Sequence, residues 1–383
     1  MKKFGCILFL VVLTVGGSCF AQTVNNLTRL NFTVEQDTVW TNLFKRTSGW
    51  FGGDGIYTIP LSSGKTLFIF SDTMIGKINS GKLEPGSVMV HNSVAYLRGE
   101  EPKPNRLIFF WDKTPSGKPE SLFIPKTPAT KKDDYLWLGS GFLNDANNFV
   151  YIFGYRIRNT GKAVFGFAET GNLLIKFPAN QKFPFKNHKQ IDAPFFIEDG
   201  NESGSFGAAI LANTKNAGAK NADGYIYVYG VKGSKKEVLV ARVLPNQFEN
   251  FQAWEYWTGK TWSKNMKEAR PVADKASNEL SVTQLADGRY AMIFQVNGIS
   301  TKTGLRLGES PVGPFGPIIE VWDCSKDLLN KNFFAYNAKA HPSLSGKNEL
   351  LISYNINSFD FLNDLKTHPQ LYRPRFIKLK IQE

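Results

Sequence analysis

Two aspartates stand near the ends of one predicted β-hairpin, and a pair of carboxylates at one sheet edge can work as an acid and a base. The segment from Gly52 to Thr73 has the pattern of a strand, a tight turn and a second strand, with Asp54 near its start and Asp72 near its end. Because a hairpin brings its ends together, both carboxylates should lie on one rim. Paired carboxylates beside glycines that leave the backbone open suit hydrolysis of a glycosidic bond.

The register of that hairpin decides how the two acids face each other. With a turn centred between Ser63 and Gly64, residues whose numbers sum to about 127 lie opposite one another. Asp54 would then face Thr73, with Asp72 as the next neighbour. The structural alternative is that both are ordinary turn residues, because aspartate hydrogen-bonds the local backbone in turns.

The N-terminus has the three regions of a secretory signal peptide. The basic residues Lys2 and Lys3 precede an apolar run from Cys6 to Val15, and small residues follow up to Ala21. We expect cleavage after this signal peptide, residues 1–21, and a secreted or periplasmic protein. No later stretch reaches the length of about eighteen apolar residues that a membrane span needs.

Cysteine and histidine usage argues against a metal cofactor. Lipid anchoring at Cys19 is less expected than cleavage, because the preceding residues are Gly and Ser where a lipobox usually has leucine. Cys324 is then the one cysteine of the mature chain, which excludes an intrachain disulfide and a cysteine-ligated zinc site. The four histidines show no metal-ligand spacing. We expect no cofactor, although an acid of the channel could hold a structural Ca²⁺.

The basic charge does not point to nucleic acid. The formal net charge is +13, but the lysines are scattered, with short runs at Lys131-Lys132 and Lys235-Lys236. This pattern is typical of a solvated basic surface rather than a binding groove. We expect a monomer whose partner is a carbohydrate substrate, with no nucleic acid and no membrane span.

The mature chain is predicted to be all-β. Short alternating or aromatic strands separated by Asp-Gly, Asn and Ser-Gly turns recur from end to end. Beyond the first hairpin, four others are expected, at residues 135–155, 205–229, 279–295 and 341–355. Units of about 70 residues predict a five-bladed β-propeller formed by a single domain, residues 22–383, with a pair of packed sheets as the alternative. A first strand near Phe32 to Trp40 could share a blade with the last, Arg375 to Ile381, and close the ring.

The innermost strands of a propeller start at one face of the central channel, so residues at those starts converge. This rule selects Asp54 and Glu279 as acids, with Asp72 beside them as a third candidate catalytic residue. The candidate substrate-binding residues are an aromatic, an acid, two histidines and an amide: Trp137, Glu202, His91, His341 and Asn92. Their structural alternatives are solvated strand ends for the acids and backbone-bonded or packing roles for the others.

Several motifs together resemble a known family: the Gly-Asp-Gly strand with Phe70-Ser71-Asp72-Thr73, and four later segments at residues 205–230, 254–257, 279–282 and 310–315. They look like secreted five-bladed propellers described as domains of unknown function, a group related to endo-D-arabinanases. The architecture is also similar to arabinanase and invertase-type glycosidases.

The resemblance implies glycoside hydrolysis, with Asp54 as nucleophile or base and Asp72 or Glu279 as proton donor. We therefore expect a secreted glycoside hydrolase that acts on a complex polysaccharide, which could contain arabinofuranose. The alternative is a non-catalytic glycan-binding propeller in which the same acids accept hydrogen bonds from sugar hydroxyls.

Overall fold

Antiparallel β-strands dominate the described chain, which confirms the expected all-β class. The structure is a computed structural model that describes residues 1, 26–61, 64–161 and 166–382. Within them, the helices α2 (Thr38–Leu43) and α3 (Phe361–Thr367) interrupt the strands. Apart from Met1, the expected signal peptide lies outside the described residues.

Five sheets follow one another along the described chain, with their strands side by side in chain order except that β1 joins the last sheet. The first holds β3 (Tyr57–Leu61), β4 (Lys65–Phe70), β8 (Ser93–Arg98) and β9 (Leu107–Phe110). The second holds β12 (Tyr135–Asn144), β13 (Phe149–Asn159), β14 (Phe167–Pro178) and β15 (Lys189–Ala193). The third holds β16 (Phe196–Ile197), β17 (Gly204–Asn213), β18 (Tyr225–Lys232), β19 (Glu237–Val243), β20 (Glu255–Trp257) and β21 (Trp262–Ser263). The fourth holds β22 (Leu280–Gln284), β23 (Tyr290–Gln295), β24 (Lys302–Gly308) and β25 (Ile319–Asp323). The fifth holds β26 (Phe333–Ala340), β27 (Glu349–Ser358), β28 (Pro374–Ile381) and β1 (Phe32–Gln36).

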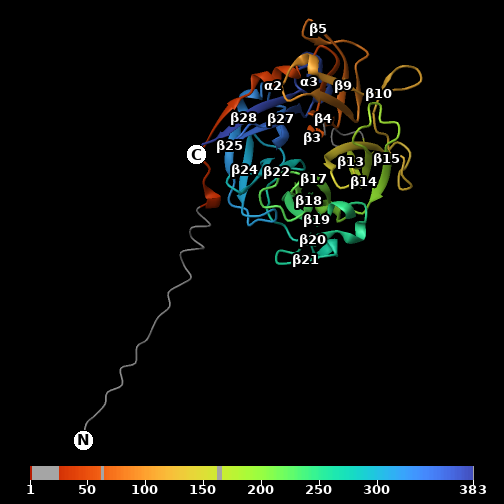
Figure 1. The fold of residues 1–383 in the computed structure, drawn as a ribbon. Helices are drawn as coiled ribbons and strands as arrows, with labels where there is room; N and C mark the ends of the chain where they lie inside the picture. The colour runs from red at the N-terminus through yellow and green to blue at the C-terminus, as the bar shows by residue number, and fades with distance from the viewer. Residues whose placement is uncertain (2–25, 62–63, 162–165, 383) are drawn as a thin grey trace.

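These sheets surround a common centre in the manner of a β-propeller (Figure 1). The inner strands are neighbours: β12 packs beside β3 and β17, and β22 packs beside β17 and β26. β1 pairs with β28, so that the N-terminal strand completes the sheet formed by the C-terminal strands. The two ends of the described chain thus share one sheet, as the sequence predicts, and this closes the ring.

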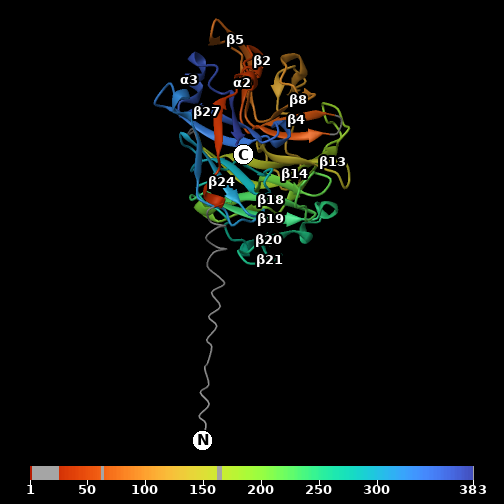
Figure 2. The same ribbon diagram turned by 60° about the vertical axis from the view of Figure 1, so that its left-hand side comes forward.

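A smaller sheet stands beside the first sheet and contains β2 (Ser48–Gly53), β5 (Thr73–Asn79), β6 (Lys82–Leu83) and β7 (Val88–Val90). β5 lies at the top of the molecule in both views (Figures 1 and 2). β10 (Asp112–Lys113) and β11 (Pro119–Glu120) form a short separate ribbon. Asp54 follows β2 and Asp72 precedes β5, so both lie where the chain passes between two sheets.

The hairpins expected at residues 135–155, 205–229 and 279–295 correspond to the pairs β12–β13, β17–β18 and β22–β23. The expectation for the last hairpin, at residues 341–355, is wrong in the position of its first strand. Its inner strand is β26, which ends at Ala340, and the turn that follows contains the 3₁₀ helix η7 (Pro342–Leu344). His341 therefore follows an inner strand instead of starting one.

Three inner strands contain a β-bulge. The pairing register shifts between Leu138 and Gly141 in β12, between Phe206 and Ala209 in β17, and after Tyr336 in β26. A bulge inserts one residue and re-aims the side chains beyond it. These bulges set which side chains of the inner strands turn towards the centre.

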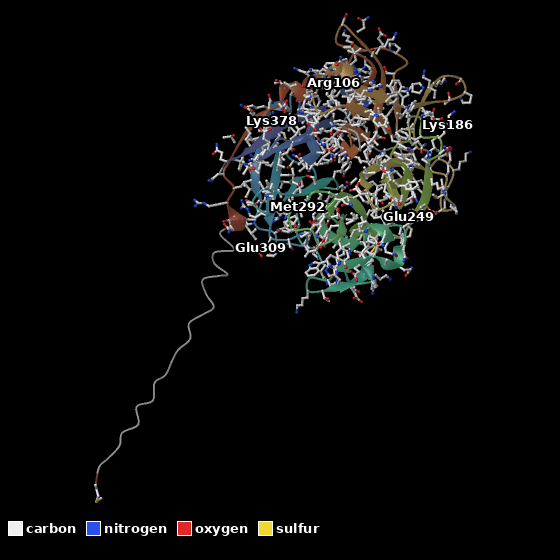
Figure 3. The ribbon with its side chains drawn as sticks, in the orientation of Figure 1. Arg106, Lys186, Glu249, Met292, Glu309 and Lys378 are labelled. Atoms are coloured by element: carbon white, nitrogen blue, oxygen red, sulfur yellow. The ribbon has the colours of Figure 1, made fainter. Side chains whose placement is uncertain are left out.

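Charged side chains such as Lys186, Glu309 and Lys378 lie at the outer edge of the molecule, while Met292 of β23 is fully buried (Figure 3). Apolar side chains fill the spaces between sheets, which buries large aromatic rings such as Trp50 and Trp254. Among the described residues, no helix has the length and apolar character needed to cross a membrane.

Candidate active site

Asp54 and Asp72 lie directly opposite each other, one residue out of the expected register. Tyr57 pairs with Ile69 in the hairpin β3–β4. Beyond this ladder, the amide of Asp54 donates to the carbonyl of Asp72 at 3.1 Å, and the amide of Ser71 donates to the carbonyl of Asp54 at 2.9 Å. The predicted pairing of Asp54 with Thr73 is therefore wrong, because the strand pairing is shifted by one residue and Thr73 faces Gly53 instead. The two acids are closer neighbours than the sequence suggested.

Glycines around Asp54 permit a close approach of three chain segments. A Cβ atom at Gly52 would lie 2.5 Å from the carbonyl oxygen of Tyr372. Gly55 has a φ of +62°, and a Cβ there would meet the Ser71 hydroxyl at 2.5 Å. Glycine is the residue that tolerates both conditions. The segment that carries Asp54 is thereby held against β4 and the stretch before β28.

The carboxyl group of Asp54 has two tyrosine donors and one orphan oxygen. The Tyr336 hydroxyl donates to Oδ2 at 2.9 Å, and the Tyr372 hydroxyl is a second donor. Oδ1 is buried and has no hydrogen-bond partner among the described residues. Burial, together with the negative charges of Asp72 and Glu279, raises the pKa of Asp54 to about 8. Asp54 can therefore hold a proton at neutral pH.

Asp72 lies in the opposite environment, because two N–H groups face its carboxylate. His91 Nδ1 lies 2.8 Å from Oδ1, and Trp137 Nε1 donates to the same oxygen at 2.9 Å. The side chain of Asp72 is 16% exposed and that of His91 is 33% exposed. Tyr135 stacks on His91 with ring centroids 3.7 Å apart, and Phe167 packs edge-on against Trp137. These contacts fix the orientation of the Asp72 carboxylate beside an aromatic group of side chains.

Glu279 precedes β22 and is paired with a buried lysine. Lys339 Nζ lies 2.5 Å from Glu279 Oε2, and the lysine side chain is 1% exposed. The same ammonium group lies 4.8 Å from the ring centroid of Tyr57. In a regular strand Tyr336 and Lys339 would point to opposite faces, but the bulge between them lets both reach the centre. Burial raises the pKa of Glu279, and Lys339 acts against that shift.

Glu169 is a further acid of this region that the sequence rule missed. It lies in β14, and the hydroxyl of Ser205 on β17 donates to it. Burial raises its pKa to about 8. The negative charges of both Glu169 and Glu279 raise the pKa of the buried Tyr155 hydroxyl, so both acids lie near this one tyrosine. Considering inner strands alone left Glu169 out, because β14 is the third strand of its sheet.

Tyr336 and Tyr372 were also missed. Tyr336 lies in the middle of β26, and Tyr372 lies just before β28 in the connection that contains α3. No local motif marks either residue. The alternation of aromatic residues in Phe334 and Tyr336 was the available signal for an inward-facing strand.

His341 does not line the candidate site. Its side chain is fully buried, with Nδ1 at 3.1 Å from the Thr58 hydroxyl and Nε2 at 2.8 Å from the Ser353 hydroxyl. Both ring nitrogens are thus engaged within the protein. The expected substrate-binding role is replaced by a bridge between the first and fifth sheets.

This burial predicts a pH dependence of stability. Burial lowers the pKa of His341 to about 3. Below pH ~6.5 the histidine of the unfolded chain therefore binds a proton that the folded chain does not bind, and this lowers the stability of the folded chain. We expect the His341→Asn variant to be less stable than the wild type at pH 7 and the gap to shrink by about 2 kcal/mol at pH 5. Urea unfolding at both values measures the gap. A gap that stays constant or widens contradicts a neutral, buried His341.

Asn92 and Glu202 also lie away from the acids. Asn92 is fully buried and bonds the backbone of Phe123 and Leu136, which anchors the segment before β12. Glu202 is exposed in the 3₁₀ helix η2 (Gly200–Glu202), where it accepts a hydrogen bond from the Ser234 hydroxyl at 2.9 Å. The side chains of Asn92 and Glu202 therefore hold local backbone and loop segments in place. The other candidate residues come together: Asp54, Asp72, Glu279, His91 and Trp137.

The described residues contain no group of three or more His, Cys, Asp or Glu side chains arranged to hold a metal ion. The acids instead pair with tyrosine, tryptophan, histidine and lysine. Side chains from the first, second, fourth and fifth sheets meet at this cluster, which we call the acid cluster: Asp54, Asp72 and Glu279.

Solved structures can be superposed on this chain, and the fold is shared where the TM-score is 0.70. A protein from Bacteroides ovatus, provisionally named a hydrolase, aligns with a TM-score of 0.70 at 21% identity over 90% of each chain. An exo-beta-1,3-galactanase from Phanerochaete chrysosporium aligns with a TM-score of 0.46 at 10% identity, over 87% of this chain and 62% of that one. The GH43_1 enzyme from Xanthomonas citri aligns at 0.43 and 13% identity, over 90% and 91%.

No curated protein sequence matches this chain. The family described as a domain of unknown function, DUF5005, matches residues 37–381. This span runs from the residue before α2 to the end of β28 and includes every member of the acid cluster. The chain therefore belongs to the DUF5005 family.

Proposed function

We propose that this protein is a glycoside hydrolase. The observation that carries the proposal is the opposed pair of Asp54 and Asp72, joined through their backbones and held in contrasting environments. Two neighbouring carboxyl groups, one of them buried so that it holds a proton, are the arrangement that glycosidic hydrolysis uses. A buried carboxyl oxygen without a hydrogen-bond partner costs stability, which further supports a role of Asp54 in binding or chemistry.

The two environments favour catalytic roles opposite to those expected from the sequence, with Asp54 as the proton donor and Asp72 as the nucleophile or base. Asp54 keeps a proton at neutral pH and donates it to the departing glycosidic oxygen as the bond from that oxygen to the anomeric carbon breaks. Asp72, faced by two N–H groups, acts as the carboxylate that attacks the anomeric carbon or takes a proton from the attacking water. Glu279 acts through its charge, which helps to raise the pKa of Asp54.

The substrate class follows from the surroundings of the pair. Tyr135, Trp137 and His91 form an aromatic wall beside Asp72, and aromatic faces stack on the C–H faces of sugars. We propose a complex polysaccharide, with arabinofuranose-containing polymers first because the motifs resemble a group related to endo-D-arabinanases. An exported protein, as the signal peptide predicts, would meet such polymers outside the cytoplasm.

A polysaccharide panel tests this function. Wild-type protein and the Asp72→Asn variant are incubated with plant, fungal and bacterial wall polysaccharides, arabinans included, and released sugars are separated by chromatography. We expect oligosaccharides or monosaccharides from at least one polymer with the wild type and none above background with the variant. Retention of a polymer on both proteins without any release would replace hydrolysis by glycan binding.

The pH profile tests the assignment of Asp54. A proton donor works while protonated, so the rate should fall as the pH rises through about 8. A base would show the reverse, with the rate falling as the pH drops below 8. The pKa of Glu169 is also about 8, so the Glu169→Gln variant is the control. Its kcat/KM should still fall as the pH rises through about 8. If kcat/KM of Glu169→Gln no longer fell at alkaline pH, Glu169 and not Asp54 would be the proton donor.

A further inference from the structure

A row of apolar side chains leads from the acid cluster to the surface. Phe334 and Tyr336 lie two residues apart on β26 and so share one face of the strand, with ring centroids 5.5 Å apart. Phe334 contacts Phe359 with centroids 4.6 Å apart. The row thus starts at the hydroxyl that donates to Asp54 and ends at Phe359, just before α3.

The outer end of the row is open to solvent. Phe334 is 7% exposed, whereas Phe359 is 47% exposed. Ile299, which is 45% exposed, pairs with Tyr336 in an isolated antiparallel bridge and so lies beside the same row. Unlike an isolated exposed side chain, Phe359 continues a buried aromatic row that reaches the acid cluster.

The chemistry of the row identifies the ligand. Hydrogen-bonding groups accompany the rings, since the Asn357 amide reaches the Tyr336 hydroxyl at 3.4 Å and that hydroxyl donates to Asp54. A sugar offers an apolar C–H face together with hydroxyl groups, and it matches this mixture better than an apolar peptide side chain does.

We propose that Phe359 and Ile299 form a binding platform for sugar residues of the substrate that lie outside the scissile bond. The platform rests on the proposed glycoside hydrolysis and deepens it, because it assigns the enzyme an oligomeric or polymeric glycan rather than a single sugar. The chain would stack on Phe359, pass over Phe334 and present its reactive bond at Asp54 and Asp72.

Calorimetric binding tests the platform without relying on turnover. The Asp72→Asn protein is titrated with monosaccharides and with oligosaccharides of increasing length prepared from the polysaccharide panel. Adding Phe359→Ala should weaken binding of the longer oligosaccharides by about 5- to 10-fold, as expected for the loss of one stacked ring, and leave monosaccharide binding unchanged. Phe359→Trp should retain the affinity.

The matched control is Leu362→Ala, since Leu362 is a 68% exposed side chain of the neighbouring helix α3 and is not part of the aromatic row. It should bind every oligosaccharide as the parent does. Oligosaccharide binding that Phe359→Ala leaves intact overturns the platform while the proposed function survives. Failure of every oligosaccharide to bind the Asp72→Asn protein overturns both.

Discussion

The Asp72→Asn and Asp54→Asn variants are each expected to hydrolyse polysaccharide about 10²- to 10⁴-fold more slowly than the wild type, with the fold unchanged. Asparagine keeps the size of the side chain but can neither carry the negative charge nor transfer the proton. At Asp72 it still meets Trp137 and His91, so the loss should fall on kcat more than on the structure. Initial rates of reducing-end release, with circular dichroism of each variant, measure the effect.

The two variants should differ in one informative respect. The charge of Asp72 helps to raise the pKa of Asp54, and Asp72→Asn removes this charge. The residual activity of Asp72→Asn should therefore fall with rising pH at a lower pH than the wild-type activity does. Asp112→Asn, at an exposed aspartate of β10, is the matched control and should retain full activity. Near-wild-type hydrolysis by both Asp54→Asn and Asp72→Asn would sink the assignment of this pair.

The second large effect concerns stability. Lys339→Met should destabilise the protein by about 3 to 5 kcal/mol at pH 7, because it leaves the buried carboxylate of Glu279 without its cation. Burial already raises the pKa of Glu279, and Lys339 is the group that opposes this shift. At pH 5 the carboxyl group can take a proton instead, so the cost should be smaller there.

A double variant separates the ion pair from simple packing. Lys339→Met combined with Glu279→Gln removes both charges and should recover much of the lost stability, since apolar or neutral groups of similar size tolerate burial. Denaturant unfolding of the wild type, both single variants and the double variant completes the cycle. A Lys339→Met protein as stable as the wild type at both pH values would contradict a buried, charged pair.

Local patterns were enough to predict the fold class, three of the later hairpins and the closure of the ring. Turn signals such as Asn147-Asn148 and Asp287-Gly288 are local, and alternation within β22 or β23 reflects burial of one face. β26 was missed because the expected fifth hairpin placed its first strand at His341, after the end of β26 at Ala340. Asn337 has a positive φ of 62°, and the bulge there was invisible to a rule based on period two.

The same reasons explain which site residues were found. Asp54 and Glu279 precede inner strands, and Asp72 follows the strand that pairs with the inner strand β3, so topology alone brings the three acids together. Tyr336 and Lys339 depend on the bulge, and Tyr372 depends on the course of a long connection between β27 and β28. His341 was misplaced because its neighbour Pro342 was interpreted as the start of an extended strand, whereas it starts a 3₁₀ helix.

The central claim is that Asp54 holds a proton at neutral pH because it is buried beside the charge of Asp72. Carbon-13 NMR of protein labelled at aspartate carboxyl carbons tests it most directly, with Asp54→Asn used to assign the signal. The account predicts one aspartate that titrates near pH 8 in the wild type, is missing in Asp54→Asn and titrates at lower pH in Asp72→Asn. A wild-type protein in which every aspartate titrates below about pH 5 would contradict it.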